Sequence, residues 1–207
     1  MYTPPAFRED DPQALQAMIE GAGLASLVTA TPGGLMATPL PLLFDPHEGP
    51  HGTLYGHLAR ANPQWSAPVL GEAMVLFSGS DAYVSPGWYA AKREHGKVVP
   101  TWNYAAVHAY GTAEFFEDAG RLLDLVTRLT DRHEAGREEA WKVDDAPGAF
   151  IAAQLRGIVG LRLEISRIEG KRKMSQNRSA EDRAGVAEGL RREGGERALA
   201  VAGEIPV

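Results

Sequence analysis

The stretch GHLARANPQW, at residues 56–65, combines residue types that can hold a phosphate group. Arg60 and Asn62 follow a predicted strand directly, at a turn that Asn62-Pro63 starts. A guanidinium, a side-chain amide and the exposed backbone N–H groups of a turn offer several donors to an anion. The alternative is an arginine that forms a surface salt bridge, and these residues alone do not separate the two interpretations.

A second stretch, KMSQNR at residues 173–178, offers similar chemistry nearer the C-terminus. It carries two cations, one hydroxyl and two amides, which suit a phosphate group or the polar edge of a heterocycle. The surrounding region, residues 162–197, has ten basic and seven acidic residues, although the whole chain has a net charge of −6. A local anion site and a solvated charged face are both consistent with this pattern.

Residues 98–116 are typical of a strand with two unlike faces, because side chains alternate along a strand. One face is small and apolar and suits packing against an interior. The other carries rings with polar tips, which are enriched at protein interfaces and in small-molecule pockets. We expect it to meet a partner subunit or a planar ligand; the alternative is a half-exposed face covered by the aromatic loop before it. The ring-bearing face comprises Trp102, Tyr104, Ala106, His108, Tyr110, Thr112 and Glu114, and the small face Asn103, Ala105, Val107, Ala109, Gly111, Ala113 and Phe115.

Several classes of site are disfavoured by what the sequence lacks. The chain has no cysteine, so it has no disulfide, thiolate nucleophile or cysteine-based metal site. Its six histidines form no HExxH-like pattern, so we predict no metal site. The GxSxG, P-loop and GxGxxG motifs are absent. The negative net charge argues against non-specific attraction to nucleic acid.

The elements that must position these residues are strands first and helices later. Helices are predicted at about 11–22, 118–133, 146–158 and 180–192, and the second has a buried stripe of Leu122, Leu125, Val126 and Leu129. Strands are predicted at LASLVTAT, GLMATPLPLLFD, TLYGHL, EAMVLFSG, DAYVS, the segment described above and IVGLRLEISRIEG. Because parallel βαβ alternation is missing, this order predicts an α+β fold on an antiparallel sheet or barrel, with peripheral helices.

The length of 207 residues suits one domain. We expect residues 1–170 to form it with its inserted helices, and residues 171–207 to complete it with a basic loop and a helix. Neither a signal peptide nor an apolar membrane span is recognisable, which predicts a cytoplasmic location without membrane contact.

Five blocks of the sequence resemble the PaiB family, the FMN-binding negative transcriptional regulators. They are MYTPPAF, GHLARANPQW, DAYVSPGWY, KVVPTWNYAAVHAYG and KMSQNRSAEDRAGV, in the family's order along nearly the whole chain. The resemblance implies an antiparallel split β-barrel of the flavin reductase and pyridoxamine-phosphate oxidase type. It also implies a homodimer with FMN at the interface.

The resemblance further implies which residues meet the flavin. The backbone near Thr38 and Leu40 would bind the isoalloxazine edge. The turn from His57 to Asn62 would hold the ribityl and phosphate groups, with Arg60 as the main phosphate partner. Pro39 departs from the family, which commonly has a histidine there; proline removes an imidazole and a backbone donor, so reduced FMN occupancy is expected if this position contacts flavin. The full set implied to bind cofactor is Thr38, Leu40, His57, Leu58, Ala59, Arg60, Asn62, Trp102, Asn103, Gln176, Asn177 and Arg178.

Three functions stay open at this point. The first is the flavin-binding regulator; a DNA contact would fit it, but the sequence has no helix-turn-helix signature, and its C-terminal arginines are interleaved with acids. The second is a flavin reductase or other FMN-dependent oxidoreductase, with His57, His108 or Tyr104 as proton donor. The third is a split barrel that binds another planar cofactor, such as haem on His108 or His57. We expect Trp102 and Asn103 to line the ligand site, and His108 and Tyr110 to face a partner subunit.

Overall fold

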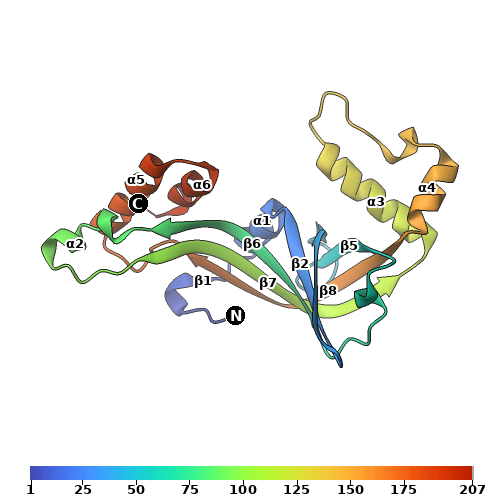
Figure 1. Ribbon diagram of the computed structural model, residues 1–207, viewed down its shortest axis with the longest axis horizontal. Coiled ribbons are helices and arrows are strands. Elements are labelled where there is room, and N and C mark those ends of the chain that lie inside the picture. The colour runs from blue at the N-terminus through green and yellow to red at the C-terminus, as the bar shows by residue number, and fades with distance from the viewer. Residues whose placement is uncertain (207) are drawn as a thin grey trace. The chain divides into compact units, whose positions relative to one another are not determined.

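The computed structural model describes residues 1–206 as an antiparallel sheet with helices around it (Figure 1). The sheet has the strand order β3-β2-β6-β7-β8-β5-β4, and β1 pairs with β8. The α+β prediction is therefore confirmed. The strands are β1 (Arg8–Glu9), β2 (Leu24–Thr31), β3 (Gly34–Pro41), β4 (Leu43–Asp45), β5 (Thr53–Ala59), β6 (Ala73–Val84), β7 (Thr101–Phe116) and β8 (Ile158–Lys173).

The four predicted helices are present, within a few residues of their expected bounds. The α-helices are α1 (Pro12–Gly21), α2 (Ala91–Glu94), α3 (Ala119–Glu134), α4 (Gly148–Leu155), α5 (Ala180–Glu193) and α6 (Glu196–Glu204). Short 3-10 helices are η1 (Pro5–Phe7), η2 (Pro63–Trp65), η3 (Pro86–Trp88) and η4 (Val143–Asp145). The short helix α2 lies in the segment predicted to be a long aromatic loop, and α6 was not expected.

The chain forms two compact units, which we describe separately. Unit 1 contains residues 1–21, 78–107 and 169 onward, and unit 2 contains residues 22–77 and 108–168. The long strands β6, β7 and β8 contribute residues to both units. The expected grouping of residues 1–170 with 171–207 into one domain stays a prediction.

The core of unit 1 is built by α5 and α6, which pack together (Figure 1). Two glycines of α5 allow Trp88 to lie against this helix: a Cβ on Gly189 would lie 2.3 Å from the Trp88 ring, and one on Gly185 would lie 2.3 Å from the Trp88 carbonyl oxygen. The buried residues are Ala82, Val84, Tyr89, Ala105, Met174, Val186, Ala187, Leu190, Val201, Ala202 and Ile205.

Helix α3 supplies the main helical packing of unit 2. Its predicted apolar stripe is confirmed, because Leu122, Leu125 and Leu129 are buried and Val126 is partly buried against them. Asp118 caps the helix by accepting a hydrogen bond from the backbone N–H of Arg121 at 2.8 Å. The same cluster includes Leu43, Phe116 and Leu155, with Tyr55 and Ile158 packed against it.

Two strand predictions differ from the structure. EAMVLFSG and DAYVS lie on the single strand β6, which passes close to β7 at Gly79: a Cβ there would lie 2.9 Å from the Ala105 side chain. GLMATPLPLLFD forms β3 and β4 instead of one strand, with the break after Pro41. Both Pro39 and Pro41 lie on β3, the edge strand, where a residue without a backbone N–H is tolerated.

The alternation predicted for residues 98–116 is confirmed within β7. From Asn103 to Gly111 the odd-numbered residues are buried, and from Trp102 to Tyr110 the even-numbered residues are partly or fully exposed.

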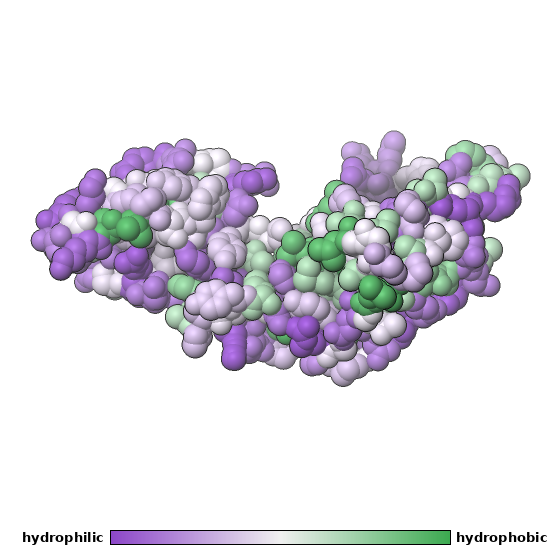
Figure 2. Space-filling view, turned by 60° about the horizontal axis from the view of Figure 1, so that its bottom comes forward, coloured by the Kyte–Doolittle hydropathy of each residue, from purple (hydrophilic) through white to green (hydrophobic). Residues whose placement is uncertain are grey.

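Hydrophobic and hydrophilic residues are interspersed on the face of the molecule shown in Figure 2. No helix among residues 1–206 is long and apolar enough to cross a membrane.

Candidate functional site

A chain of hydrogen bonds ties the turn after β5 to the edge of the sheet in unit 2. Asn62 donates to the Thr38 hydroxyl at 2.8 Å, and Thr38 donates to the Gln64 side chain at 2.5 Å. Gln64 is fully buried and donates to the Leu27 carbonyl and the Thr29 hydroxyl. Thr38 and Asn62, two of the predicted site residues, are thus in direct contact. Gln64 was missed because nothing in the PQW sequence signals its burial.

Arg60 is anchored to the protein itself. Its guanidinium donates to the backbone carbonyls of Arg156 at 2.6 Å and Ile158 at 3.3 Å, and it forms an ion pair with Glu117. Trp65 donates its indole N–H to the Arg60 carbonyl at 2.8 Å. Arg60 therefore forms a salt bridge, which was the alternative interpretation of this residue. Its role as the main phosphate partner stays a prediction.

Leu40 and Leu58 have buried side chains, so only their backbone can reach a ligand. Since β3 is an edge strand, it presents backbone N–H and C=O groups on its outer side. Ala59 ends β5 with an exposed side chain, and Pro39 is also exposed. The predicted contact of Thr38 and Leu40 with an isoalloxazine edge is compatible with this placement.

His57 lies on the same face of β5 as Tyr55, because the two are two residues apart on a strand. Its neighbour across the ladder is Gly160, and a Cβ there would lie 2.3 Å from the Phe116 ring. The His57 Nδ1 atom is buried and has no hydrogen-bond partner within residues 1–206. Burial lowers the pKa of His57, so its neutral form is favoured.

A second set of predicted residues is held in unit 1 by the loop after β8. Asn103 is fully buried, and its side-chain amide donates to the Ser175 hydroxyl at 3.1 Å; this hydroxyl lies 3.2 Å from Asn103 Oδ1, to which it can donate in turn. Ser175 has a φ of 63°, a left-handed conformation that is uncommon for serine. Gln176 folds back onto the loop, where it accepts from the Met174 N–H at 2.6 Å and donates to the Arg172 carbonyl. Asn177 is exposed.

Three cations of unit 1, Lys171, Lys173 and Arg178, form no ion pair with a carboxylate among residues 1–206. Lys171 is 7% exposed and donates to the Tyr2 carbonyl at 3.1 Å, with the Tyr104 ring 5.0 Å from its Nζ. Lys173 donates to the Thr101 hydroxyl at 2.7 Å. Burial, followed by the charges of Lys171 and Arg178, lowers the pKa of Lys173. The uncompensated charge of Lys171, Lys173 and Arg178 makes this group a candidate anion site.

Tyr89 completes this group. Its side chain is 1% exposed, and the Arg178 guanidinium lies 4.8 Å from its ring centroid. Burial raises the pKa of Tyr89, while the positive charge of Arg178 opposes the shift. Its hydroxyl is the second buried side-chain atom of residues 1–206 that lacks a hydrogen-bond partner. Lys171 and Tyr89 were not predicted as site residues, whereas Lys173 lies in the KMSQNR stretch that the sequence indicated as a possible anion site.

The rings on the more exposed face of β7 differ in their burial and contacts along the strand. Trp102 is 54% exposed and meets Tyr83 edge-on, with ring centroids 6.1 Å apart. His108 lies edge-on to Tyr110 at 6.3 Å, and the Arg167 guanidinium stacks 3.6 Å from the Tyr110 ring centroid. The expected contact of His108 and Tyr110 with a partner subunit stays a prediction. No cluster of metal-ligating side chains occurs within residues 1–206.

These features fit a flavin phosphate and ring better than an apolar ligand. The two buried polar atoms without partners, on His57 and Tyr89, both lie at or beside predicted flavin residues. The three cations offer charge to a phosphate, and an indole such as that of Trp102 offers a stacking surface. His57 and Tyr89 belong to different units, and one flavin meeting both sets of residues stays a prediction.

Comparison with known proteins identifies the family. Residues 1–167 match the family model described as "Putative FMN-binding domain". The chain is 34% identical over 194 residues to the protease synthase and sporulation protein PAI 2 of Bacillus subtilis, which covers 93% of this chain and 90% of that protein. It belongs to this FMN-binding family. An uncharacterized protein of Aspergillus fumigatus is 35% identical over 184 residues, 73% of this chain and 70% of the relative.

Solved structures confirm the split-barrel fold expected for the FMN-binding family. The flavocytochrome Anf3 of Azotobacter vinelandii superposes with a TM-score of 0.59 at 18% identity, covering 86% of this chain and 75% of that one. The FAD and heme binding protein of Mycobacterium smegmatis gives 0.57 at 17% identity, covering 91% and 80%. At these identities the likeness concerns the fold alone. FMN, the predicted cofactor, follows from the family match.

The neutral state of His57 predicts a pH dependence of stability. Unfolded His57 binds a proton near pH 6.5, whereas the folded protein keeps it neutral to lower pH. The free energy of unfolding should therefore fall as the pH drops through about 6.5, because the unfolded state binds more protons there. In urea unfolding at pH 7.5 and 5.5, His57→Gln should reduce this loss. His47→Gln, at an exposed position, should leave it unchanged; an equal loss in H57Q and wild type would contradict the assignment.

Proposed function

We propose that this chain is an FMN-binding regulatory protein of the PaiB type that acts in the cytoplasm as a homodimer, with flavin at the subunit interface. The observation that carries the proposal is the family match over residues 1–167, together with the similarity to a Bacillus subtilis protein named for protease synthesis and sporulation. When bound, FMN supplies a planar ring that absorbs visible light and accepts electrons.

The residues of each unit have separate roles in this proposal. In unit 1, Lys171, Lys173 and Arg178 neutralise the phosphate charge, since no carboxylate of residues 1–206 is paired with them. The Asn103–Ser175 pair fixes the loop that carries Arg178. In unit 2, the backbone beside Thr38 and Leu40 faces the ring edge, and the Thr38–Asn62 contact holds that edge against the turn. Pro39 removes one N–H from this edge.

Exposed aromatic residues support a homodimer. Trp102 is 54% exposed and Tyr83 is 43% exposed, both in unit 1. Rings of this kind are enriched where subunits meet. Burying them against a second copy would remove apolar surface from water, which stabilises an assembly.

The proposal is tested by the mass of the protein in solution and by its contacts with DNA. Light scattering during gel filtration should give twice the chain mass, and Trp102→Ala should shift the mass toward that of a single chain. Regulation by direct repression predicts a sequence-specific complex with DNA that persists as salt is raised, against a scrambled duplex as control. A monomeric wild type would contradict the dimer. NADPH oxidation far above that of free flavin would instead favour an oxidoreductase.

A further inference from the structure

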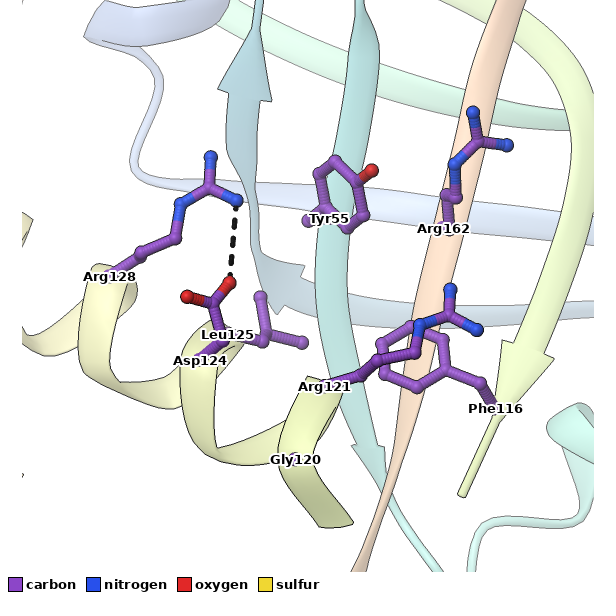
Figure 3. Close-up of a pocket in the computed structure, with 8 residues that line it drawn as sticks. All are labelled: Tyr55, Phe116, Gly120, Arg121, Asp124, Leu125, Arg128 and Arg162. Atoms are coloured by element: carbon purple, nitrogen blue, oxygen red, sulfur yellow. Dashed lines mark ion pairs between the residues drawn. The ribbon is translucent and has the colours of Figure 1, made fainter. Parts of the chain in front are cut away.

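Unit 2 contains a cavity that none of the predicted flavin residues lines. Its volume is about 410 Å³, within the range of small-molecule sites. Helix α3 forms one wall, and β5, β8 and the end of β7 form the rest (Figure 3). The lining residues are Tyr55, Phe116, Gly120, Arg121, Asp124, Leu125, Arg128 and Arg162.

Three guanidinium groups and one carboxylate line this cavity, so most of its charged lining side chains are cationic. Arg162 lies opposite Tyr55 on the neighbouring strand, and both side chains line the cavity on the side of the sheet. Arg162 donates to Glu48 at 2.6 and 2.9 Å and to Glu164 at 3.0 Å, and these hydrogen bonds raise its pKa. Tyr55 also donates to Glu48, at 2.5 Å. The Arg162 guanidinium is therefore already engaged by these two carboxylates.

The two arginines of α3 are held less completely. Arg121 and Arg128 are seven residues apart, which places them on one face of the helix. Figure 3 shows them on either side of the Tyr55 ring in this view. Arg128 makes only long ion pairs, at 3.5 Å to Asp45 and 3.7 Å to Asp124. None of the hydrogen bonds within residues 1–206 comes from its guanidinium, so its N–H groups remain available to a ligand.

Arg121 lies between a carboxylate and a ring. Its NH1 group is 2.8 Å from Glu114, and its guanidinium carbon lies 3.8 Å from the Phe116 ring centroid. This stacking orients the planar donor fork beside the apolar wall made by Phe116 and Leu125. A ligand suited to this cavity has an anionic head for the arginines and an apolar body for that wall.

We propose that this cavity is a second ligand site, which binds a small organic dianion through Arg121 and Arg128. The head group is a phosphate monoester or a pair of carboxylates, because both match the donor fork of arginine. In a regulatory protein such a site serves an effector that is distinct from the flavin. The site itself is argued from the cavity and stands without the flavin proposal.

The test is calorimetric titration of the full-length protein at low salt with two probes, phenyl phosphate and phthalate. We expect saturable binding of at least one probe, and the stronger probe identifies the head group. Arg128→Gln should weaken that binding by about tenfold or more, since it removes a charge-assisted contact. Arg128→Lys should weaken it less. Arg137→Gln, an equal change of charge outside the cavity, should leave it unchanged.

Two results would overturn the proposal. One is the absence of saturable binding for both probes at millimolar concentration in a folded wild type. The other is a loss of FMN affinity in R128Q that equals its loss of probe affinity, because the cavity would then be part of the flavin site. An unchanged unfolding midpoint in R128Q verifies that the variant is folded. If R128Q does not fold, the probe affinity and FMN affinity of R128K are compared instead.

Discussion

Replacing Gln64 by leucine should lower the free energy of unfolding by about 2–5 kcal/mol. Gln64 is fully buried, and its side chain bonds four groups of β2 and β3. It donates to the Leu27 carbonyl at 3.2 Å, the Thr29 hydroxyl at 3.1 Å and the Met36 carbonyl at 3.3 Å, and accepts from Thr38 at 2.5 Å. Leucine keeps much of the volume but leaves these buried groups unpaired, and each unpaired group costs about 1–3 kcal/mol.

Urea unfolding followed by circular dichroism measures this loss. Gln13→Leu, at an exposed position on α1, is the matched control and should change stability by no more than about 0.5 kcal/mol. The Gln64 variant should also bind FMN more weakly, because Thr38 loses the partner that holds it toward Asn62. A loss of unfolding free energy as small as that of the control would contradict the role of Gln64 as the anchor of the turn.

Replacing Arg178 by alanine should weaken FMN binding by about 10- to 100-fold. Arg178 lies in a group of three cations without carboxylate partners, beside the buried hydroxyl of Tyr89. Removing its charge leaves the phosphate with fewer donors. The FMN affinity of the wild type should also fall as salt is raised, because the contact is electrostatic, and the variant should show a weaker salt dependence.

Quenching of flavin fluorescence during titration gives both affinities. Arg191→Ala removes the same charge from an exposed position on α5 and should bind FMN as the wild type does. Arg178→Lys should retain part of the affinity, since it keeps the charge and loses the planar fork. Equal affinities in R178A and R191A would place the phosphate elsewhere, with Arg60 as the remaining predicted partner.

Local patterns predicted most of the elements of this fold. The two faces of β7 could be read from Trp102 onward, because alternation depends only on the strand conformation. The stripe of α3 was equally clear from its helical spacing. Helix α6 was not predicted; Gly194 and Gly195, both at positive φ, form the turn that separates it from α5.

The candidate site was less predictable, because its contacts join residues distant in sequence. Arg60 is bonded to the Arg156 carbonyl, 96 residues away, and to Glu117, 57 residues away. Asn103 depends on Ser175, at a separation of 72 residues. No local pattern distinguishes an arginine committed to such partners from one that is available to a phosphate. The bonding of Arg60 to the protein, and the lack of a carboxylate partner for Arg178 within residues 1–206, therefore became visible only in the fold.

A titration of the purified, flavin-free protein is the decisive test of FMN binding by this chain. FMN fluorescence should be quenched to saturation at about one FMN per chain, with micromolar or tighter affinity, while riboflavin, which lacks the phosphate, binds far more weakly. Such a difference would locate much of the affinity in the phosphate and its cations. An unsaturated titration at FMN concentrations well above micromolar, in protein shown to be folded, would contradict FMN binding by this chain.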